Sequence, residues 1–264
     1  MKTGIPAPAV DEAISRLRAA GCVFAEDEAA VLADAATDEA TLMAMVERRA
    51  LGEPLEQVVG FADFCGVRVR LRPGVFVPRV RSELLVRIAA ETAERGSVVV
   101  DLCCGSGALG LAVRARRPGI ELHAADVDPV AVACARDNLD GDVHHGDLFD
   151  ALPGDLRGRV AVLLANVPYV ATRHIPLLPA EARDHEPRTA LDGGADGLDV
   201  FRAVVTATGD WLAPGGIVLS EITEAQAPAA VEVVRAAGLE ADLLFDDDLE
   251  ARVIRGRKSV GAVR

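Results

Sequence analysis

The 264-residue sequence is poor in aromatic residues, with one tryptophan, one tyrosine and seven phenylalanines. It contains no apolar run near the ~20 residues that a membrane-spanning helix needs, and no N-terminal segment resembling a signal peptide. Its five cysteines are odd in number and lack the spacing of metal ligands. These absences predict a reduced, soluble, cytoplasmic protein with neither a membrane segment nor a metal site.

Positive charge is also scarce, because 28 lysines and arginines face 41 aspartates and glutamates, for a net charge of −13. A polyanion is repelled by such an average field, so we expect no stable binding of nucleic acid unless basic residues cluster. One such cluster is present, and it either forms a basic patch or covers the outer face of a hairpin: Arg68, Arg70, Arg72, Arg79 and Arg81.

The chain divides by its patterns into three parts. Residues 1–60 contain short segments of helical periodicity, one of them capped by Asp38, and predict a small helical domain. Residues 61–80 form a linking β-hairpin, because Val67, Val69 and Leu71 alternate with arginines before a Pro73-Gly74 turn. Residues 81–264 form the larger domain.

In the larger domain, strand patterns alternate with helix patterns. This alternation predicts a mostly parallel sheet covered by helices on both faces. The segment 170–196 has no clear periodicity, which is typical of a substrate-facing or disordered loop. The expected helices are 81–94, 107–116, 129–139, 197–212 and 225–237, and the expected strands are 97–103, 120–126, 142–146, 160–165, 215–222, 240–246 and 251–257.

A glycine-rich turn follows the first of these strands. Gly105, Gly107 and Gly110 give the spacing GxGxxG, and Asp126 comes 21 residues after Gly105 at the end of the next strand. The spacing fits a dinucleotide site. However, Asp101 places a carboxylate near the turn, which disfavours a pyrophosphate and favours the cationic S-adenosylmethionine. Both cofactors remain open on the turn alone, with S-adenosylmethionine preferred.

Further residues complete the expected cofactor site. Asp128-Pro129 already supplies a helix cap and first turn, so Asp126 is free to bind the ribose hydroxyls. Asp147 follows the third strand, where it can accept the adenine amino group while Leu148 covers the ring. Asp101 before the turn and Asn166 after the strand 160–165 are also expected to contact the cofactor. The remaining expected contacts lie in the turn, where packing or close backbone approach explains the cysteines better than nucleophilic chemistry: Cys103, Cys104, Gly105, Ser106 and Gly107.

The most specific signal is Asn166-Val167-Pro168-Tyr169, directly after the apolar strand 160–165. The Asn166 side-chain oxygen and the Val167 carbonyl can hold a planar N–H₂ group, and Pro168 keeps Val167 extended. Tyr169 can stack on that planar group. Two acceptors on its N–H bonds orient a poorly nucleophilic nitrogen toward a methyl donor. The alternative is an ordinary strand-exit turn, which we would prefer if no cofactor turn lay upstream.

The order of motifs resembles the HemK/PrmC family of protein-(glutamine-N5) methyltransferases over nearly the whole chain. The sequence differs from the family pattern at Val167, where proline is usual, and at Cys103-Cys104, which replace Gly-Thr. The landmarks that carry the resemblance are Arg48-Arg49, Gly52-Glu53-Pro54-Leu55, Gly60, Phe64, Pro78-Arg79, Ser82-Glu83, Asp101-Leu102, Gly105-Ser106-Gly107, Asp126, Asn138, Asn166 to Tyr169, Glu186-Pro187, Ala190-Leu191, Gly194, Asp196-Gly197-Leu198, Glu221-Ile222 and Gln226.

The resemblance implies a class I S-adenosylmethionine-dependent methyltransferase fold, Rossmann-like, with a seven-stranded sheet whose last hairpin is reversed. It also implies that residues 166–169 hold a substrate glutamine in a protein such as a peptide-chain release factor, which the helical domain helps to grip. Other readings remain: methylation of another protein, a small molecule or a nucleobase amine, a nicotinamide-dependent oxidoreductase, or a non-catalytic binding module.

Overall fold

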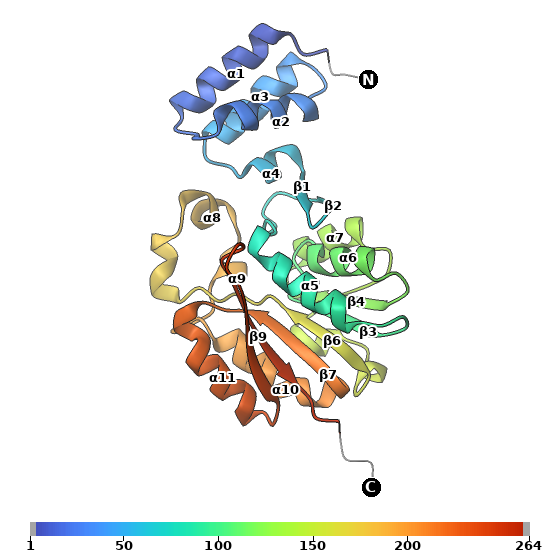
Figure 1. Cartoon of the computed structure of the whole chain (residues 1–264). Helices are drawn as coiled ribbons and strands as arrows, with labels where there is room; N and C mark the ends of the chain where they lie inside the picture. The colour runs from blue at the N-terminus through green and yellow to red at the C-terminus, as the bar shows by residue number, and fades with distance from the viewer. Residues whose placement is uncertain (1–3, 261–264) are drawn as a thin grey trace.

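The computed structural model describes residues 4–260 and begins with a bundle of three helices followed by a short fourth one (Figure 1). Asp38 caps the third helix as expected, since its carboxylate accepts a hydrogen bond from the Thr41 N–H at 2.7 Å. Leu17, Leu32 and Leu42 are fully buried and form the core of the bundle. The helices are α1 (Ala7–Ala19), α2 (Ala25–Ala35), α3 (Glu39–Ala50) and α4 (Leu55–Val59).

The linking hairpin lies earlier in the chain than the sequence predicts. Strands β1 (Phe61–Phe64) and β2 (Val67–Arg70) pair antiparallel around Cys65-Gly66, whose φ angles are 51° and 82°. Two residues with positive φ match the twist of a two-residue hairpin turn. Pro73-Gly74 does form the predicted turn, in which the Val75 N–H donates to the Arg72 carbonyl at 3.2 Å. Residues 71–79 form no strand, however, so this turn does not join the two strands of the hairpin.

The larger domain is built on a seven-stranded sheet with the order β5-β4-β3-β6-β7-β9-β8. Strands β3 to β7 run parallel, while β9 is antiparallel to both β7 and β8, which confirms the reversed last hairpin. The strands are β3 (Val98–Leu102), β4 (Glu121–Asp126), β5 (Asp142–His145), β6 (Val160–Ala165), β7 (Leu212–Glu221), β8 (Glu240–Asp246) and β9 (Ala251–Arg257).

Helices cover both faces of this sheet, as the alternation of patterns predicts. One face packs against α5 (Glu83–Thr92), α6 (Ala108–Arg116) and α7 (Pro129–Asn138), and the other against α10 (Asp199–Trp211) and α11 (Ala227–Ala236). Alternate residues of β3 serve the two faces, since Val99 joins the first core and Val100 the second. Short 3₁₀ helices complete the domain: η1 (Val80–Ser82), η2 (Leu148–Ala151), η3 (Gly154–Leu156), η4 (Thr172–Leu177) and η5 (Glu224–Gln226).

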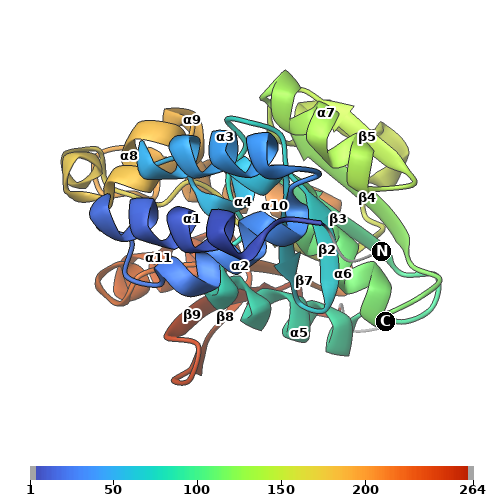
Figure 2. The same ribbon diagram turned by 90° about the horizontal axis from the view of Figure 1, so that it is seen from above.

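The segment between β6 and α10, expected as a long loop, folds into η4 and two short helices, α8 (Ala180–His185) and α9 (Arg188–Leu191). It lies beside the helical bundle (Figures 1 and 2), where Glu181 of α8 pairs with Arg49 of α3 at 2.6 Å. Glu186 follows α8 and pairs with Arg79 at 2.6 Å. This segment, residues 172–191, therefore contacts both the helical bundle and the residues that lead from the hairpin into the larger domain.

The arginines of the 68–81 cluster are each engaged within the protein. Arg68 pairs with Asp63 and Arg72 with Asp137, while Arg70 donates to the Asp137 carbonyl. Arg79 and Arg81 pair with the buried carboxylates of Glu186 and Glu221. The cluster therefore neutralises acidic neighbours rather than forming a free basic patch.

Within residues 4–260, no helix combines the length and the apolar character needed to cross a membrane.

Candidate functional site

A cavity of about 800 Å³ lies at the carboxyl ends of the central strands, between the sheet and the segment 172–191. Eleven of the residues predicted for the site line it, whereas Asp101 and Gly107 do not. The lining residues among those predicted are Cys103, Cys104, Gly105, Ser106, Asp126, Asp147, Leu148, Asn166, Val167, Pro168 and Tyr169.

The glycine-rich turn forms one wall of this cavity. Gly105 and Gly107 have φ angles of 55° and 75°, in the left-handed region that favours glycine. A Cβ on Gly105 would meet no atom within 4 Å, so the backbone there is open to a ligand. A Cβ on Gly107 would lie 2.8 Å from Leu139, so this glycine serves the packing of the turn.

Asp126 holds the turn in place in addition to facing the cavity. Its Oδ2 accepts from the Gly105 N–H at 2.8 Å and its Oδ1 from the Asp128 N–H at 2.9 Å. Burial raises the pKa of this carboxyl. Asp128 caps α7 through the Val130 N–H, as predicted, but Asp126 is not free of protein contacts. Each carboxylate oxygen still has a second lone pair for a ligand.

Asp101 lies behind the turn rather than in the cavity. Its Oδ2 accepts from the Gly110 N–H at 2.8 Å, and its Oδ1 is buried without a hydrogen-bond partner among the described residues. Burial raises the pKa of Asp101 to about 7, and the nearby Asp126 carboxylate adds to the increase. Asp101, which the sequence predicts as a cofactor residue, is thus bonded to α6 and is not among the residues that line the cavity.

Two non-glycine residues of the cavity wall have left-handed backbone conformations. Cys103 has a φ of 58° and Leu148 a φ of 43°. Such conformations cost of order 1–3 kcal/mol and cluster at ligand sites. Burial raises the pKa of the Cys103 thiol, so it remains a neutral group. Asp147 is exposed, and its carboxylate has no hydrogen bond or ion pair to another residue in the part of the chain that the structure describes.

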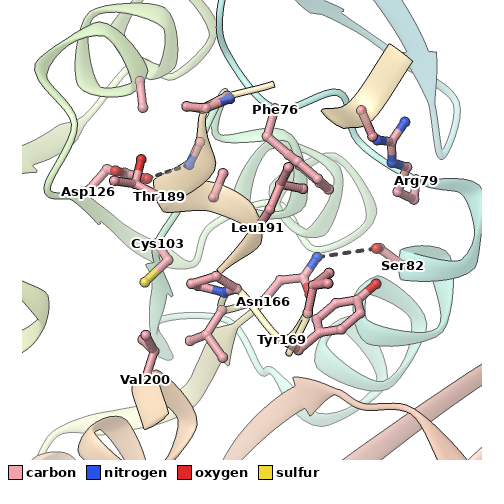
Figure 3. Close-up of a pocket in the computed structure, with 18 of the residues that line it drawn as sticks. Phe76, Arg79, Ser82, Cys103, Asp126, Asn166, Tyr169, Thr189, Leu191 and Val200 are labelled. Carbon is pink, nitrogen blue, oxygen red and sulfur yellow. Dashed lines mark hydrogen bonds between the residues drawn. The ribbon is translucent and has the colours of Figure 1, made fainter. Parts of the chain in front are cut away.

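The Asn166 carboxamide has one end bonded and the other without a partner (Figure 3). Its Nδ2 donates to Ser82 Oγ at 3.3 Å. Its Oδ1 is buried and unpartnered, and among residues 4–260 no donor bonds to the Val167 carbonyl. An unsatisfied buried polar atom costs about 1–3 kcal/mol and requires an explanation. The two acceptors that the sequence assigns to an N–H₂ group are thus both available.

Tyr169 is held by its hydroxyl group. The hydroxyl donates to Glu221 Oε1 at 2.7 Å and also contacts Arg81. Burial raises the pKa of Tyr169, and the Glu221 carboxylate raises it further, so the phenol stays protonated. Its aromatic ring lines the cavity close to Asn166 in Figure 3, where it can form a wall for a planar group.

Residues far along the chain fix the backbone of residues 166–169, which we call the clamp. A Cβ on Gly193 would lie 2.5 Å from the Pro168 carbonyl oxygen, and one on Gly197 would lie 2.2 Å from that of Tyr169. Gln226 Nε2 donates to the same Tyr169 carbonyl at 2.9 Å. The two glycines therefore permit a backbone approach that no other residue allows. Gly193, Gly197 and Gln226, together with Ser82 and Glu221, support the clamp, a role that no local sequence pattern assigns to them.

The residues present fit S-adenosylmethionine. The cavity combines an open backbone at Gly105, a half-buried carboxylate at Asp126 and an exposed carboxylate at Asp147. Carboxylates suit ribose hydroxyls, an amino group and the positive charges of this cofactor. The vacant acceptors of the clamp lie in the same cavity.

Comparison with known proteins agrees with this chemistry. The Methyltransferase small domain family matches residues 66–178. The release factor glutamine methyltransferase of Geobacter sulfurreducens is 36% identical over 188 residues, which cover 69% of this chain and 65% of that relative. The enzyme of the same name from Bifidobacterium longum is 32% identical over 271 residues, covering 88% of this chain and 92% of its own.

Among solved structures, the T. thermophilus 16S rRNA N2 G1207 methyltransferase in complex with AdoMet and guanosine has a TM-score of 0.53 and 21% identity. The superposition covers 75% of this chain and 49% of that one, and it supports the fold. The architecture and the family matches favour a methyltransferase over a nicotinamide-dependent oxidoreductase as the explanation of the glycine-rich turn. The chain belongs to the family of release factor glutamine methyltransferases.

Proposed function

We propose that this protein transfers a methyl group from S-adenosylmethionine to the side-chain amide nitrogen (N5) of a glutamine in a protein. The favoured substrate is the Gly-Gly-Gln glutamine of a peptide-chain release factor, which the names of the relatives support. One observation carries the proposal: Asn166 Oδ1 and the Val167 carbonyl are adjacent acceptors without donors at the edge of a cavity that fits the cofactor.

The cofactor residues are assigned by their positions in the cavity. Asp126 would hold the ribose hydroxyls, Asp147 and Leu148 the adenine, and the backbone of residues 103–106 the remainder of the molecule. When bound, S-adenosylmethionine supplies an electrophilic methyl group. Asp101 and Gly107 act indirectly, because they shape the turn without lining the cavity.

The clamp supplies orientation. The nitrogen lone pair of an amide is delocalised into its carbonyl group, so glutamine is a weak nucleophile. Acceptors on both N–H bonds increase the electron density on nitrogen and fix the direction of its lone pair. Because Asn166 and Val167 are positioned before the substrate arrives, no reorganisation is needed when charge develops. Pro168 restricts Val167 to extended conformations, which keeps its carbonyl in place.

The partner is a protein segment that can enter the cavity between the sheet and residues 172–191. We assign residues 1–60 to recognition of that substrate, with residues 61–80 as the link and residues 81–264 as the catalytic domain. Nucleic acid is disfavoured as a stable partner, because the net charge is −13 and the arginines at 68–81 are engaged within the protein.

The test uses labelled S-adenosylmethionine with a release factor, or with a peptide that contains Gly-Gly-Gln, and locates the methyl group by mass spectrometry. Asn166→Ala should reduce turnover by about 10²-fold or more, since one preorganised hydrogen-bonding group is lost. Its affinity for the cofactor, measured by calorimetry, should remain nearly unchanged. A peptide with glutamate in place of glutamine is the control and should accept no methyl group.

Two results would contradict the proposal. Transfer to another residue of the substrate would rule out glutamine methylation. An equal loss of cofactor affinity and turnover in Asn166→Ala would show that Asn166 belongs to the cofactor site instead.

A further inference from the structure

The Asn166 carboxamide ends a chain of hydrogen bonds that begins at a buried carboxylate. Glu221 lies at the end of β7 with its side chain 4% exposed. It accepts from Ser82 Oγ at 2.8 Å, and Ser82 Oγ in turn accepts from Asn166 Nδ2 at 3.3 Å. Ser82 is itself 1% exposed, so water does not compete for these groups.

The Glu221 carboxylate determines which group donates and which accepts in each of these hydrogen bonds. The Glu221 carboxylate pairs with Arg81 and offers only lone pairs, so the hydroxyl proton of Ser82 must point toward it. The Ser82 oxygen then offers only lone pairs to Asn166. A carboxamide has a donor end and an acceptor end of similar size, and only its N–H₂ end can satisfy a lone pair.

The opposite orientation of Asn166 would oppose the proposed chemistry. If Ser82 donated its proton to Asn166, the carboxamide oxygen would be used within the protein and the N–H₂ group would face the substrate. A substrate amide presents two N–H donors, so a donor at this position would leave both groups unpaired and would weaken substrate binding.

We propose that Ser82 and Glu221 are positioning residues that set the orientation of the Asn166 carboxamide, with its oxygen toward the substrate glutamine. This inference rests on the proposed function and deepens it. Neither residue touches the reacting atoms. Their effect passes through Asn166.

The same carboxylate also fixes the aromatic wall of the clamp. Glu221 Oε1 accepts from Tyr169 at 2.7 Å and from Arg81 Nε at 2.6 Å, while Oε2 serves Ser82. The ion pair with Arg81 and the hydrogen bonds from Tyr169 and Ser82 compensate for the burial of the charge. One anion therefore aligns two clamp residues, Asn166 and Tyr169.

The chain offers a matched control for Ser82. Ser220 precedes Glu221, is also 1% exposed, and its Oγ has no hydrogen-bond partner among the described residues. Ser82→Ala and Ser220→Ala thus each remove one buried hydroxyl, but only the first removes a bond to Asn166. Ser82→Thr keeps the hydroxyl at position 82.

The experiment measures kcat/KM on a Gly-Gly-Gln peptide, calorimetric cofactor affinity and thermal unfolding for each variant. Ser82→Ala should reduce kcat/KM about tenfold, as expected for the loss of one orienting hydrogen bond of ~1.4 kcal/mol. Cofactor affinity should stay within about twofold of the wild type, a shift of under ~0.5 kcal/mol. Ser220→Ala should match the wild type, and Ser82→Thr should recover most of the loss.

Double variants show whether the effect passes through Asn166. Ser82→Ala should cause no further loss when Asn166 is already alanine, because residues that act as one unit are not additive. Glu221→Gln should keep part of its loss in that background, because this carboxylate also holds Tyr169. If the Glu221→Gln variant does not fold, the Ser82→Ala variant alone tests whether the effect on activity passes through Asn166. The inference is overturned if Ser82→Ala behaves like Ser220→Ala, or if its loss persists in the Asn166→Ala background.

The wild-type reaction separates this inference from the function on which it rests. If the wild type leaves glutamine unmethylated, the proposed function fails and the inference falls with it. If the wild type methylates glutamine and Asn166→Ala does not, while Ser82→Ala remains fully active, only the inference fails.

Discussion

The buried carboxyl group of Asp101 makes the stability of the larger domain depend on pH. Asp101 is 1% exposed, one of its oxygens has no partner, and burial raises its pKa from 3.8 to about 7. In the unfolded chain the same group titrates near its ordinary value. The folded state therefore binds an extra proton between these two values, so stability falls as pH rises from about 4 to about 7.

Asp101→Asn isolates this contribution. Asparagine keeps an oxygen for the Gly110 N–H and carries no charge at any pH. Its amide N–H₂ introduces a cost that does not vary with pH. Three pKa units correspond to ~4 kcal/mol, and the part that develops between pH 5 and pH 8 is about 3 kcal/mol. Relative to the variant, the wild type should lose this amount of unfolding free energy over that interval.

The assay is urea denaturation followed by tryptophan fluorescence at several pH values. The chain has one tryptophan, Trp211, which is 2% exposed and stacks on Phe149 in the larger domain, so its fluorescence reports unfolding of the domain that contains Asp101. Asp38→Asn is a control, because hydrogen bonding to Thr41 lowers the pKa of Asp38. Asp38 is ionised in both states from pH 5 to pH 8, so this variant should differ from the wild type by a constant.

The reasoning would be refuted by a flat difference between the wild type and Asp101→Asn across pH 5 to 8. It would also be refuted if the wild type gained stability over the variant as pH rose, because that sign requires a lowered pKa in the folded state.

Two further predictions concern the clamp support and the cofactor site. Gly197→Ala places a Cβ 2.2 Å from the Tyr169 carbonyl at a φ of +80°, so urea denaturation should show a loss of at least about 1–3 kcal/mol. Gly209→Ala, which meets no atom within 4 Å in α10, should instead be neutral or gain about 0.5–1 kcal/mol. Asp126→Ala should weaken S-adenosylmethionine binding about 10- to 100-fold in calorimetry. Unchanged affinity would contradict the ribose assignment.

Much of the fold follows from local patterns in the sequence. Apolar runs that end at Asp101, Asp126 and Asn166 correspond to β3, β4 and β6, and parallel strands bring their carboxyl ends to one edge of the sheet. The grouping of most predicted site residues in one cavity depends only on this topology. For the same reason, the clamp could be located from a single strand and the four residues after it.

The orientation of Asp101 follows from the alternation of side chains along β3. Along β3, Val98, Val100 and Leu102 face one core and Val99 faces the other. Side chains alternate along a strand, so Asp101 must share the face of Val99 and point toward α6. The strand period, rather than distance from the turn, decides which carboxylate reaches the cavity.

Other features depend on contacts across long sequence separations. Ser82 and Glu221 lie 139 residues apart and meet only after the sheet has formed. A glutamate at the end of a buried strand must have hydrogen-bonding partners, but the local sequence does not identify them. Pro73-Gly74 is a strong turn signal and does form a turn, but the hairpin turn is Cys65-Gly66, which needs a positive φ that cysteine rarely adopts.

The ion pairs of the segment 172–191 affect how the protein can be dissected. Glu181 of this segment pairs with Arg49 of the helical bundle, and Glu186 pairs with Arg79 and accepts from the Val77 N–H. A truncated chain starting after residue 60 would leave Glu181 without Arg49 and one cavity wall without its outer support. Kinetic constants from such a fragment would describe an altered entrance, so the two parts of the enzyme should be studied together.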